Sequence, residues 1–416
     1  MLLNESRATR RALTLIEVLV ALAAAMVILA AVVNVLGMAT KGIADSRSIV
    51  EATNRLRSAQ HLLRMDLSGA TCPGIVWQRG EMGNGYFEAI EGPLLDSANS
   101  SSANAATSMG GDPDDVLFFT TRSLGQPFSG KVNGATYQSD KAEVVWFMTP
   151  MRTFTTGQGD IQVYALRRRV FLILNENAGI TPSGSNTTPT ENFDVSFRQG
   201  TSGNVLNTLG SLGNRRNRIY HNSGTTNCFQ TPAGATAPST MAFATGGNRE
   251  GEDIVLTNVL SFDVKVFDPT APIKQQTGVA GMGLIPGDVG YPNTTSTNTG
   301  ASGAFVNLGQ ENFSNFTRAM GSGKPGSAVT VTGLPTYDTW TFDYENDGVA
   351  QGTSGSADPA VNGKDDNNDG VVDDANERET YPPYPYPLRG IQVKIRVYDP
   401  VSKSVRETTI EETFVQ

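Results

Sequence analysis

A single carboxylate, Glu17, interrupts a long apolar stretch near the N-terminus. The range Leu13–Ala39 contains no other charged residue. A charged side chain is costly inside a membrane, so a carboxylate in such a stretch needs a partner. A free α-amino group four residues upstream would be one, and it exists only if the chain is cut between Ala12 and Leu13. The residues therefore predict cleavage at this bond, followed by pairing of Glu17 with the new N-terminus.

A second candidate for chemistry is an acidic segment in the C-terminal part. Oxygen-bearing side chains occupy its first, third, fifth and ninth positions, and a carbonyl is available at the seventh: Asp365, Asn367, Asp369, Asp373 and Val371. Gly370 at the sixth position permits the sharp turn of a calcium loop. The twelfth position holds asparagine instead of the usual bidentate glutamate, so the segment is not a complete EF-hand. It predicts calcium binding, with a solvated acidic turn as the alternative.

The remaining residues of chemical interest give no enzymatic constellation. The only histidines are His61 and His221, which excludes a zinc site of several histidines. Gly321–Pro325 lacks the glycine spacing and the hydroxyl residue of a phosphate-binding loop. Cys72 and Cys228 could form a disulfide, but the sequence equally allows two unpaired thiols. We therefore expect no enzyme and no catalytic residue.

The apolar stretch itself predicts a transmembrane helix over residues 13–39. At about 1.5 Å per residue it is about 40 Å long, and a bilayer core is about 30 Å thick. Arg7, Arg10 and Arg11 favour a cytoplasmic N-terminus. A signal peptide normally has a shorter apolar region, and a twin-arginine signal or a plain anchor leaves Glu17 unexplained.

Beyond the membrane segment, the pattern predicts an amphipathic helix over residues 40–70. Its apolar stripe recurs at spacings of four and three: Ile49, Thr53, Leu56, Gln60, Leu63, Leu67 and Ala70. Five charged residues fall off the stripe: Arg47, Glu51, Arg55, Arg57 and Arg64. Such a narrow apolar face predicts packing on a sheet or on a partner helix.

From residue 71 onward the periodicity favours strands, which predicts an α+β chain with an antiparallel β domain over 71–416. The expected strands are Asp115–Thr121, Ala142–Met148, Val163–Leu174, Ile254–Phe267, Ile391–Tyr398 and Val405–Phe414. Turn residues in Asp399–Lys403 predict a C-terminal β-hairpin. Insertions rich in Gly, Ser, Thr and Asn are expected at Asp96–Asp112, Ala178–Gly251, Ile273–Gly333 and Gly348–Pro387.

The charge balance argues against nucleic acid as a partner. The net charge is −9, and removal of the leader 1–12, which carries three arginines and one glutamate, leaves −11. Phosphate binding needs clustered Lys and Arg instead.

The N-terminal residues resemble a type IV prepilin leader: a short basic stretch, a small residue, and an apolar helix with Glu at its fifth position. Ala12 and Leu13 stand where the family usually has Gly and Phe. The resemblance implies cleavage after Ala12 by a prepilin peptidase and N-methylation of Leu13. It also implies that Glu17 pairs with the N-terminal amine of a neighbouring subunit during assembly.

Four later segments resemble J-type minor pseudopilins of type II secretion and, nearly as closely, W-type minor pilins: 62–70, 256–268, Trp340 and 387–395. The resemblance implies a pilin-like long helix packed on an antiparallel sheet. It also implies a single-pass inner-membrane subunit with a periplasmic C-terminal domain, whose partners are other pseudopilins, the peptidase and the assembly platform. The expected function is filament initiation in protein export. The alternative is a minor pilin or tip adhesin of a type IV pilus.

Overall fold

The computed structural model describes residues 14–72, 83–92, 112–156, 159–176, 178–182, 193–200, 203–213, 217–219, 251–275, 283–286, 291, 297–307, 336–339 and 388–414. The chain divides into two compact units. One comprises Met1–Thr53 with Asp399–Ser404, and the other comprises Asn54–Tyr398 with Val405–Gln416.

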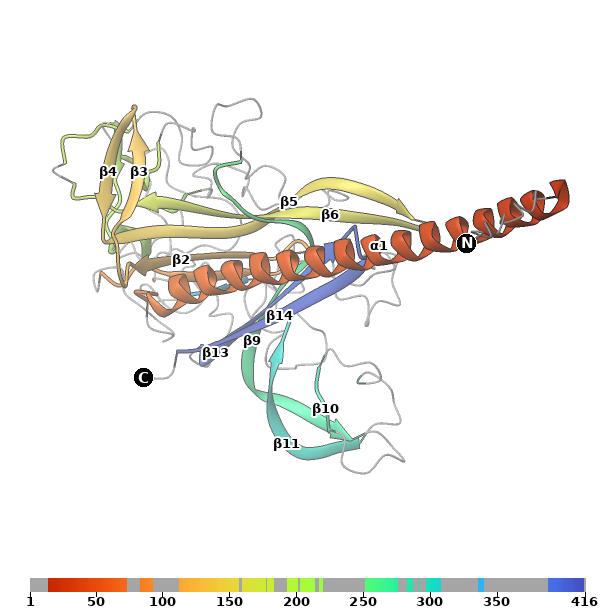
Figure 1. Cartoon of the computed structure of the whole chain (residues 1–416). Coiled ribbons are helices and arrows are strands. Elements are labelled where there is room, and N and C mark those ends of the chain that lie inside the picture. Colours follow the sequence, from red (N-terminus) through yellow and green to blue (C-terminus); the bar gives the residue numbers. More distant parts are fainter. Residues whose placement is uncertain are drawn as a thin grey trace, which may run out of the picture. The chain divides into compact units, whose positions relative to one another are not determined.

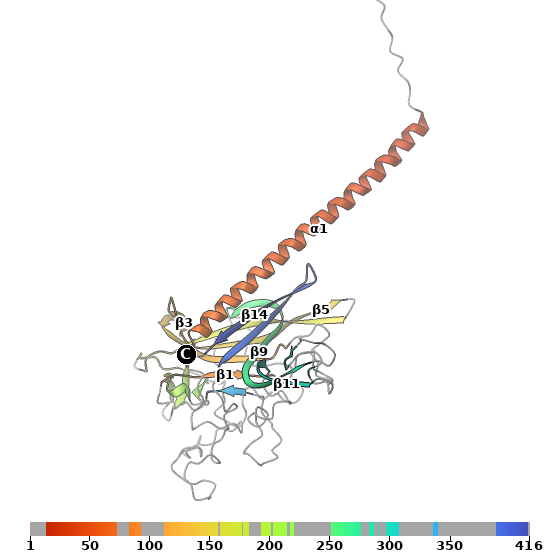
Figure 2. The same cartoon turned by 90° about the horizontal axis from the view of Figure 1, so that it is seen from below.

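A single continuous helix, α1 (Leu15–Ser68), spans 54 residues and covers both predicted helices without a break, except for their outermost residues (Figures 1 and 2). It ends at Gly69, whose amide donates to the carbonyl of Met65 at 3.2 Å. A Cβ at Gly69 would lie 2.2 Å from the backbone oxygen of Arg122. Glycine is therefore required here, because the helix end passes directly against the backbone of the sheet.

The β-structure is dominated by one large sheet, which is ten-stranded in the part of the chain that the structure describes. Its strands, in spatial order, are β12 (Thr336–Asp338), β1 (Phe87–Ile90), β2 (Val116–Arg122), β5 (Lys141–Thr156), β6 (Gly159–Leu172), β9 (Ile254–Gln275), β13 (Gly390–Asp399) and β14 (Ser404–Thr413). Two further strands, β10 (Gly283–Leu284) and β11 (Thr297–Val306), pair with β9 where it extends beyond the rest of the sheet (Figure 1). The pairings from β1 to β13 are antiparallel, so the predicted α+β class and all six predicted strands are confirmed.

The central strands are buried on both faces. In β2, Leu117 and Phe119 belong to the apolar core that includes α1, whereas Val116 and Phe118 belong to a second core on the opposite face. β5 alternates in the same way. Burial on both faces explains why these strands read as continuous apolar runs in the sequence.

The last turns of α1, from Asn54 onward, cover one face of this sheet. Leu56, Leu63 and Leu67, three members of the predicted stripe, are buried in the core with the sheet residues. All five charged residues expected off the stripe are exposed. The packing face is wider than predicted, because Ala59 and Asp66 are also buried.

The expectation of loops over 178–251 and 273–333 is wrong in part. The first range contains β7 (Phe197–Gly200), β8 (Gly203–Leu206) and the 3-10 helix η2 (Ser211–Gly213), and the second contains the end of β9, β10 and β11. A hairpin of β3 (Phe128–Val132) and β4 (Ala135–Ser139) also lies outside the expected strands.

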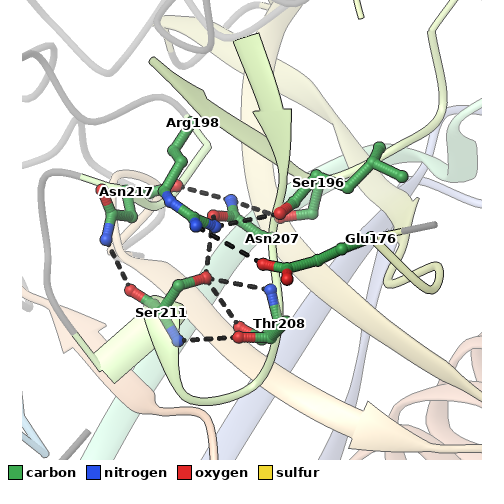
Figure 3. A network of polar contacts seen from close by, with 8 residues as sticks. Glu176, Ser196, Arg198, Asn207, Thr208, Ser211 and Asn217 are labelled. Atoms are coloured by element: carbon green, nitrogen blue, oxygen red, sulfur yellow. Dashed lines mark hydrogen bonds and ion pairs between the residues drawn. The ribbon is translucent and has the colours of Figure 1, made fainter. Parts of the chain in front are cut away.

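Amide and hydroxyl groups connect described residues within the first of these ranges. Asn207 Nδ2 donates to Ser196 Oγ at 2.9 Å and to the carbonyl of Asn217 at 2.7 Å, while Ser211 Oγ donates to Asn207 Oδ1 at 3.0 Å (Figure 3). The polar side chains that favour a loop in the sequence thus connect the described residues around Asn207.

The predicted C-terminal hairpin is present as β13 and β14. Asp399 accepts hydrogen bonds from Ser402 Oγ at 2.6 Å and from the amide of Val401 at 3.0 Å, which is the turn chemistry expected of this residue. Ser48 of α1 also donates to Asp399, at 2.6 Å.

Charged and amide side chains pair across the exposed side of this hairpin. Arg396 Nε lies 2.6 Å from Glu407 Oε2, and Gln392 Nε2 donates to Glu411 Oε1 at 2.8 Å. β14 lies at the end of the strand order, so it forms one edge of the sheet among the described residues.

Candidate functional site

The N-terminal end of α1 carries the carboxylate that the sequence singles out. The amide and the hydroxyl of Thr14 donate to Glu17 Oε2 at 2.9 and 3.0 Å, and the amide of Glu17 lies 3.4 Å from Thr14 Oγ1. This reciprocal pattern is a capping box, in which Thr14 is the N-cap and Glu17 the third helical residue. One oxygen of the Glu17 carboxylate therefore finds its hydrogen-bond donors within its own helix.

The capping box leaves part of the Glu17 carboxylate available. Both bonds fall on Oε2, and no described residue donates to Oε1. The side chain is exposed. A positively charged group could therefore approach Oε1 without breaking the helix cap.

The first half of α1 presents an apolar surface on all its sides. From Thr14 to Ala44 every side chain is exposed, including large ones such as Leu19, Ile28 and Leu36. The helix is long and apolar enough to cross a membrane. A surface of this kind is suited to contact with lipid or with other helices.

Most of the other sequence-predicted site residues lie outside the described part of the chain. These are Ala12 and Leu13 of the cleavage site, Cys228, and the calcium-loop residues Asp365, Asn367, Asp369, Val371 and Asp373. Cleavage, methylation, the disulfide and calcium binding by the loop therefore stay predictions. Of the remaining candidates, Cys72 is buried beside the sheet and His61 is exposed on α1.

A polar anchor that the sequence analysis missed joins α1 to the sheet. Asp66 is 3% exposed, and Arg168 of β6 donates to both of its carboxylate oxygens at 2.6 Å. Trp146 Nε1 of β5 also donates to Asp66 Oδ2, at 2.9 Å. An aspartate at a core-facing position of an amphipathic helix is the sequence signal for such an anchor, because a buried charge needs a partner.

A second missed feature is a group of buried carboxylates where β1 ends and β2 begins. Glu91, Asp112 and Asp115 are at most 1% exposed, and each places a carboxylate oxygen within 4.8 Å of the others. Burial, and then the charges of Asp115 and Glu91, raise the pKa of Asp112 well above its usual range. The sequence signal is the run Asp112–Asp115, which puts three carboxylates directly before a strand buried on both faces.

A third buried polar group lies on the face of the sheet opposite α1. Glu143 of β5 accepts hydrogen bonds from Tyr86 Oη at 2.6 Å, from Ser196 Oγ at 2.6 Å and from the amide of Ile219 at 3.0 Å. Burial raises the pKa of Glu143, and these hydrogen bonds oppose that shift.

A fully buried ion pair lies beside Glu143. Arg218 Nη1 lies 2.9 Å from Glu88 Oε2, and its guanidinium carbon lies 3.9 Å from the centre of the Tyr86 ring. Together these groups attach Ser196, Arg218 and Ile219 to the sheet. Their burial suits them to a structural role rather than to contact with a substrate.

The described residues thus combine an exposed apolar helix, a capped carboxylate at its N-terminus and a folded β domain that includes its last turns. Such an arrangement can hold a domain at a membrane and offer a helix surface to other helices. No protein-family model matches the chain, and neither the curated proteins nor the solved structures include a match to it.

Proposed function

We propose that the chain is a pilin-like assembly subunit, anchored by α1 in the inner membrane, with its β domain in the periplasm. The role of a minor pseudopilin in type II secretion fits the sequence resemblance best. In this proposal the chain is cleaved after Ala12 and methylated on the amine of Leu13. Its role is non-catalytic, namely to initiate or cap a short filament for protein export.

The observation that carries the proposal is the position of Glu17 on an exposed apolar helix. The capping box uses one carboxylate oxygen and leaves Oε1 without a donor among the described residues. In a medium of low dielectric a carboxylate and an amine attract each other strongly. The amine on Leu13 of a neighbouring subunit is thus a suitable partner for Glu17 Oε1.

The rest of α1 supports the same proposal. The exposed apolar side chains of its first half provide the surface for packing against the helices of other subunits. Its last turns are held on the sheet by apolar packing and by Asp66, so the helix and the β domain are firmly joined there. The partners we propose are other pseudopilins, a prepilin peptidase and an inner-membrane assembly platform.

Mass spectrometry of the N-terminal peptide from the native host tests the processing step. We expect a peptide that begins at Leu13 and carries one methyl group on its amine. An intact leader, or cleavage at residue 20 or later, would contradict the proposal, because Glu17 would then have no amine at the required distance in sequence.

A minor pilin or tip adhesin of a type IV pilus is the alternative, since it would use the same processing and the same helix. Deletion of the gene separates the two. Loss of protein export without loss of surface pili favours the pseudopilin, whereas the protein's presence in isolated pili together with normal export favours the pilin.

A further inference from the structure

The carboxylates at the common end of β1 and β2 come together from separate parts of the chain. Glu91 directly follows β1, Asp112 and Asp115 shortly precede β2, and the two strands pair so that Ile90 lies opposite Val116. The antiparallel pairing therefore brings the three acids to one end of the strand pair.

The sheet fixes the backbone that carries these acids. The carbonyl of Asp112 accepts from the amide of Phe262 at 2.8 Å, which holds this segment beside β9. The carboxylate of Asp115 accepts from the amides of Gly92 at 3.2 Å and of Val264 at 2.7 Å. These contacts orient Asp115 before any ligand arrives, so little conformational entropy is lost when one binds.

Asp112 differs from an ordinary buried acid. Its side chain is fully buried, and neither carboxylate oxygen accepts a hydrogen bond from an N–H or hydroxyl group of a described residue; its neighbour within hydrogen-bonding reach is another carboxyl, that of Asp114. One of these oxygens lies within 4.8 Å of oxygens of both Glu91 and Asp115, so the group points into the cluster. Buried polar groups are normally satisfied by a protein group, water or an ion.

The surrounding residues add negative charge. Asp114 packs against Gly92 so closely that a Cβ there would lie 2.0 Å from its carboxyl carbon. The charge of Asp263 also raises the pKa of Asp115. Asp263 itself has a basic neighbour, because Lys265 Nζ lies 3.2 Å from Asp263 Oδ2.

We propose that Glu91, Asp112 and Asp115 bind one calcium ion, or another hard divalent cation, at the common end of β1 and β2. Calcium–oxygen distances of about 2.3–2.6 Å put ligands on opposite sides of one ion about 5 Å apart, so the observed separation suits a single ion. All three ligands are carboxylates, which favours a hard cation over zinc or copper. Burial favours calcium over magnesium, because magnesium gives up its water reluctantly.

This site is separate from the predicted calcium loop, and it does not depend on the proposed role in assembly. An ion there would join the ends of β1 and β2 beside β9.

Calorimetric titration of the full-length chain in detergent, after removal of metal with chelator, tests the proposal. The variant Asp365→Ala/Asp369→Ala removes the loop candidate and keeps the buried cluster. We expect it to bind one calcium ion. Adding Asp112→Asn, which removes one of the three negative charges but keeps an oxygen, should raise the dissociation constant about tenfold or more, because calcium affinity depends on the charge of the ligands.

Asp160→Asn in the same loop variant is the matched control, because Asp160 is exposed and lies outside the cluster. It should leave calcium binding unchanged. The proposal is overturned if the loop variant binds no calcium at millimolar concentration, or if Asp112→Asn and Asp160→Asn give the same dissociation constant. Should Asp112→Asn fail to fold by circular dichroism, the titration of the loop variant still decides.

Discussion

Arg168 of β6 donates to both carboxylate oxygens of Asp66 at 2.6 Å, and this bidentate pair connects the last turns of α1 to the sheet. Side-chain exposures of 15% for Arg168 and 3% for Asp66 show that the pair is largely shielded from water. Removing one partner would leave the other buried and unpaired.

We therefore expect Asp66→Ala to lower the free energy of unfolding by about 3–5 kcal/mol, the usual effect of breaking a buried pair. Arg168→Lys should also destabilise the protein, because lysine cannot make the two parallel bonds. Thermal unfolding of the full chain in detergent, followed by circular dichroism, measures both effects. Arg57→Lys, on the exposed side of α1, is the control; equal melting temperatures for Arg57→Lys and Arg168→Lys would contradict the expected role of the pair.

Glu143 should make stability depend on pH. Burial raises the pKa of Glu143 in the folded protein. The stability that this shift contributes is therefore complete at pH values below the pKa of Glu143 in the unfolded chain. It is lost as pH rises through the pKa of Glu143 in the folded protein. We expect Glu143→Gln to destabilise the protein. Both carboxylate oxygens of Glu143 accept hydrogen bonds, so the NH₂ group of glutamine would replace one acceptor and face a hydrogen-bond donor. The difference in melting temperature between wild type and this variant should narrow as pH rises from 4.5, the ordinary pKa of a glutamate. A difference that widens would contradict the raised pKa.

Asp112→Asn should stabilise the metal-free protein. Asparagine has nearly the same shape and removes one ionisable group from among neighbouring carboxylates. No N–H or hydroxyl group of a described residue donates to Asp112, so no such bond is lost. In chelator we expect a melting temperature a few degrees above wild type, since about 1 kcal/mol shifts it by about 2–4 °C in a large domain. A lower melting temperature than that of Asp160→Asn would argue against repulsion within the cluster.

Variants of the capping box separate the two roles of Glu17. Glu17→Gln keeps an oxygen that can accept from Thr14 but removes the charge, whereas Thr14→Ala removes the cap and keeps the charge. We expect Glu17→Gln to reduce incorporation into filaments about tenfold or more while cleavage continues, because the amine loses its counter-charge. Thr14→Ala should have a much smaller effect.

Immunoblots of sheared filaments and of membranes measure incorporation and cleavage in these strains. Equal incorporation of Glu17→Gln and wild type would show that the charge is dispensable, and the pairing proposal would fail. Greater loss with Thr14→Ala than with Glu17→Gln would assign the role of Glu17 to the helix cap alone.

The elements predicted correctly are those whose periodicity reports burial directly. Spacings of three and four predict the packed side of α1, and the alternation in Ile391–Tyr398 predicts β13. The apolar runs in β2 and β5 are recognisable because both faces of these strands are buried. In each case the pattern of a single segment carries the information.

The missed strands depend on partners that are distant in sequence. β11 is rich in Gly, Thr and Ser and reads as a loop, but pairing with β9 places Phe305 opposite Phe267. Gly303, at a φ of 112°, permits the irregular backbone beside Phe267. The β3–β4 hairpin is different, since its turn residues Asn133 and Gly134, both with positive φ, are a readable local signal.

The candidate sites also differ in whether a local sequence pattern or a contact between distant segments reveals them. Glu17 is conspicuous because its neighbours are apolar, and its spacing from Thr14 is that of a capping box. The run Asp112–Asp115 is a local signal of buried acids, but Glu91 joins it only when β1 pairs with β2, and no local pattern reveals that pairing.

Among the described residues, the two edge strands of the sheet have features that disfavour aggregation. An open edge strand is a template on which another chain can add a strand, and proteins discourage this with charged or very short edge strands. β14 carries Glu407 and Glu411 in its cross-strand pairs, and β12, at the other end, has only three residues. If the chain assembles through α1, as proposed, these edges would disfavour polymerisation through the sheet and leave self-association to the helix.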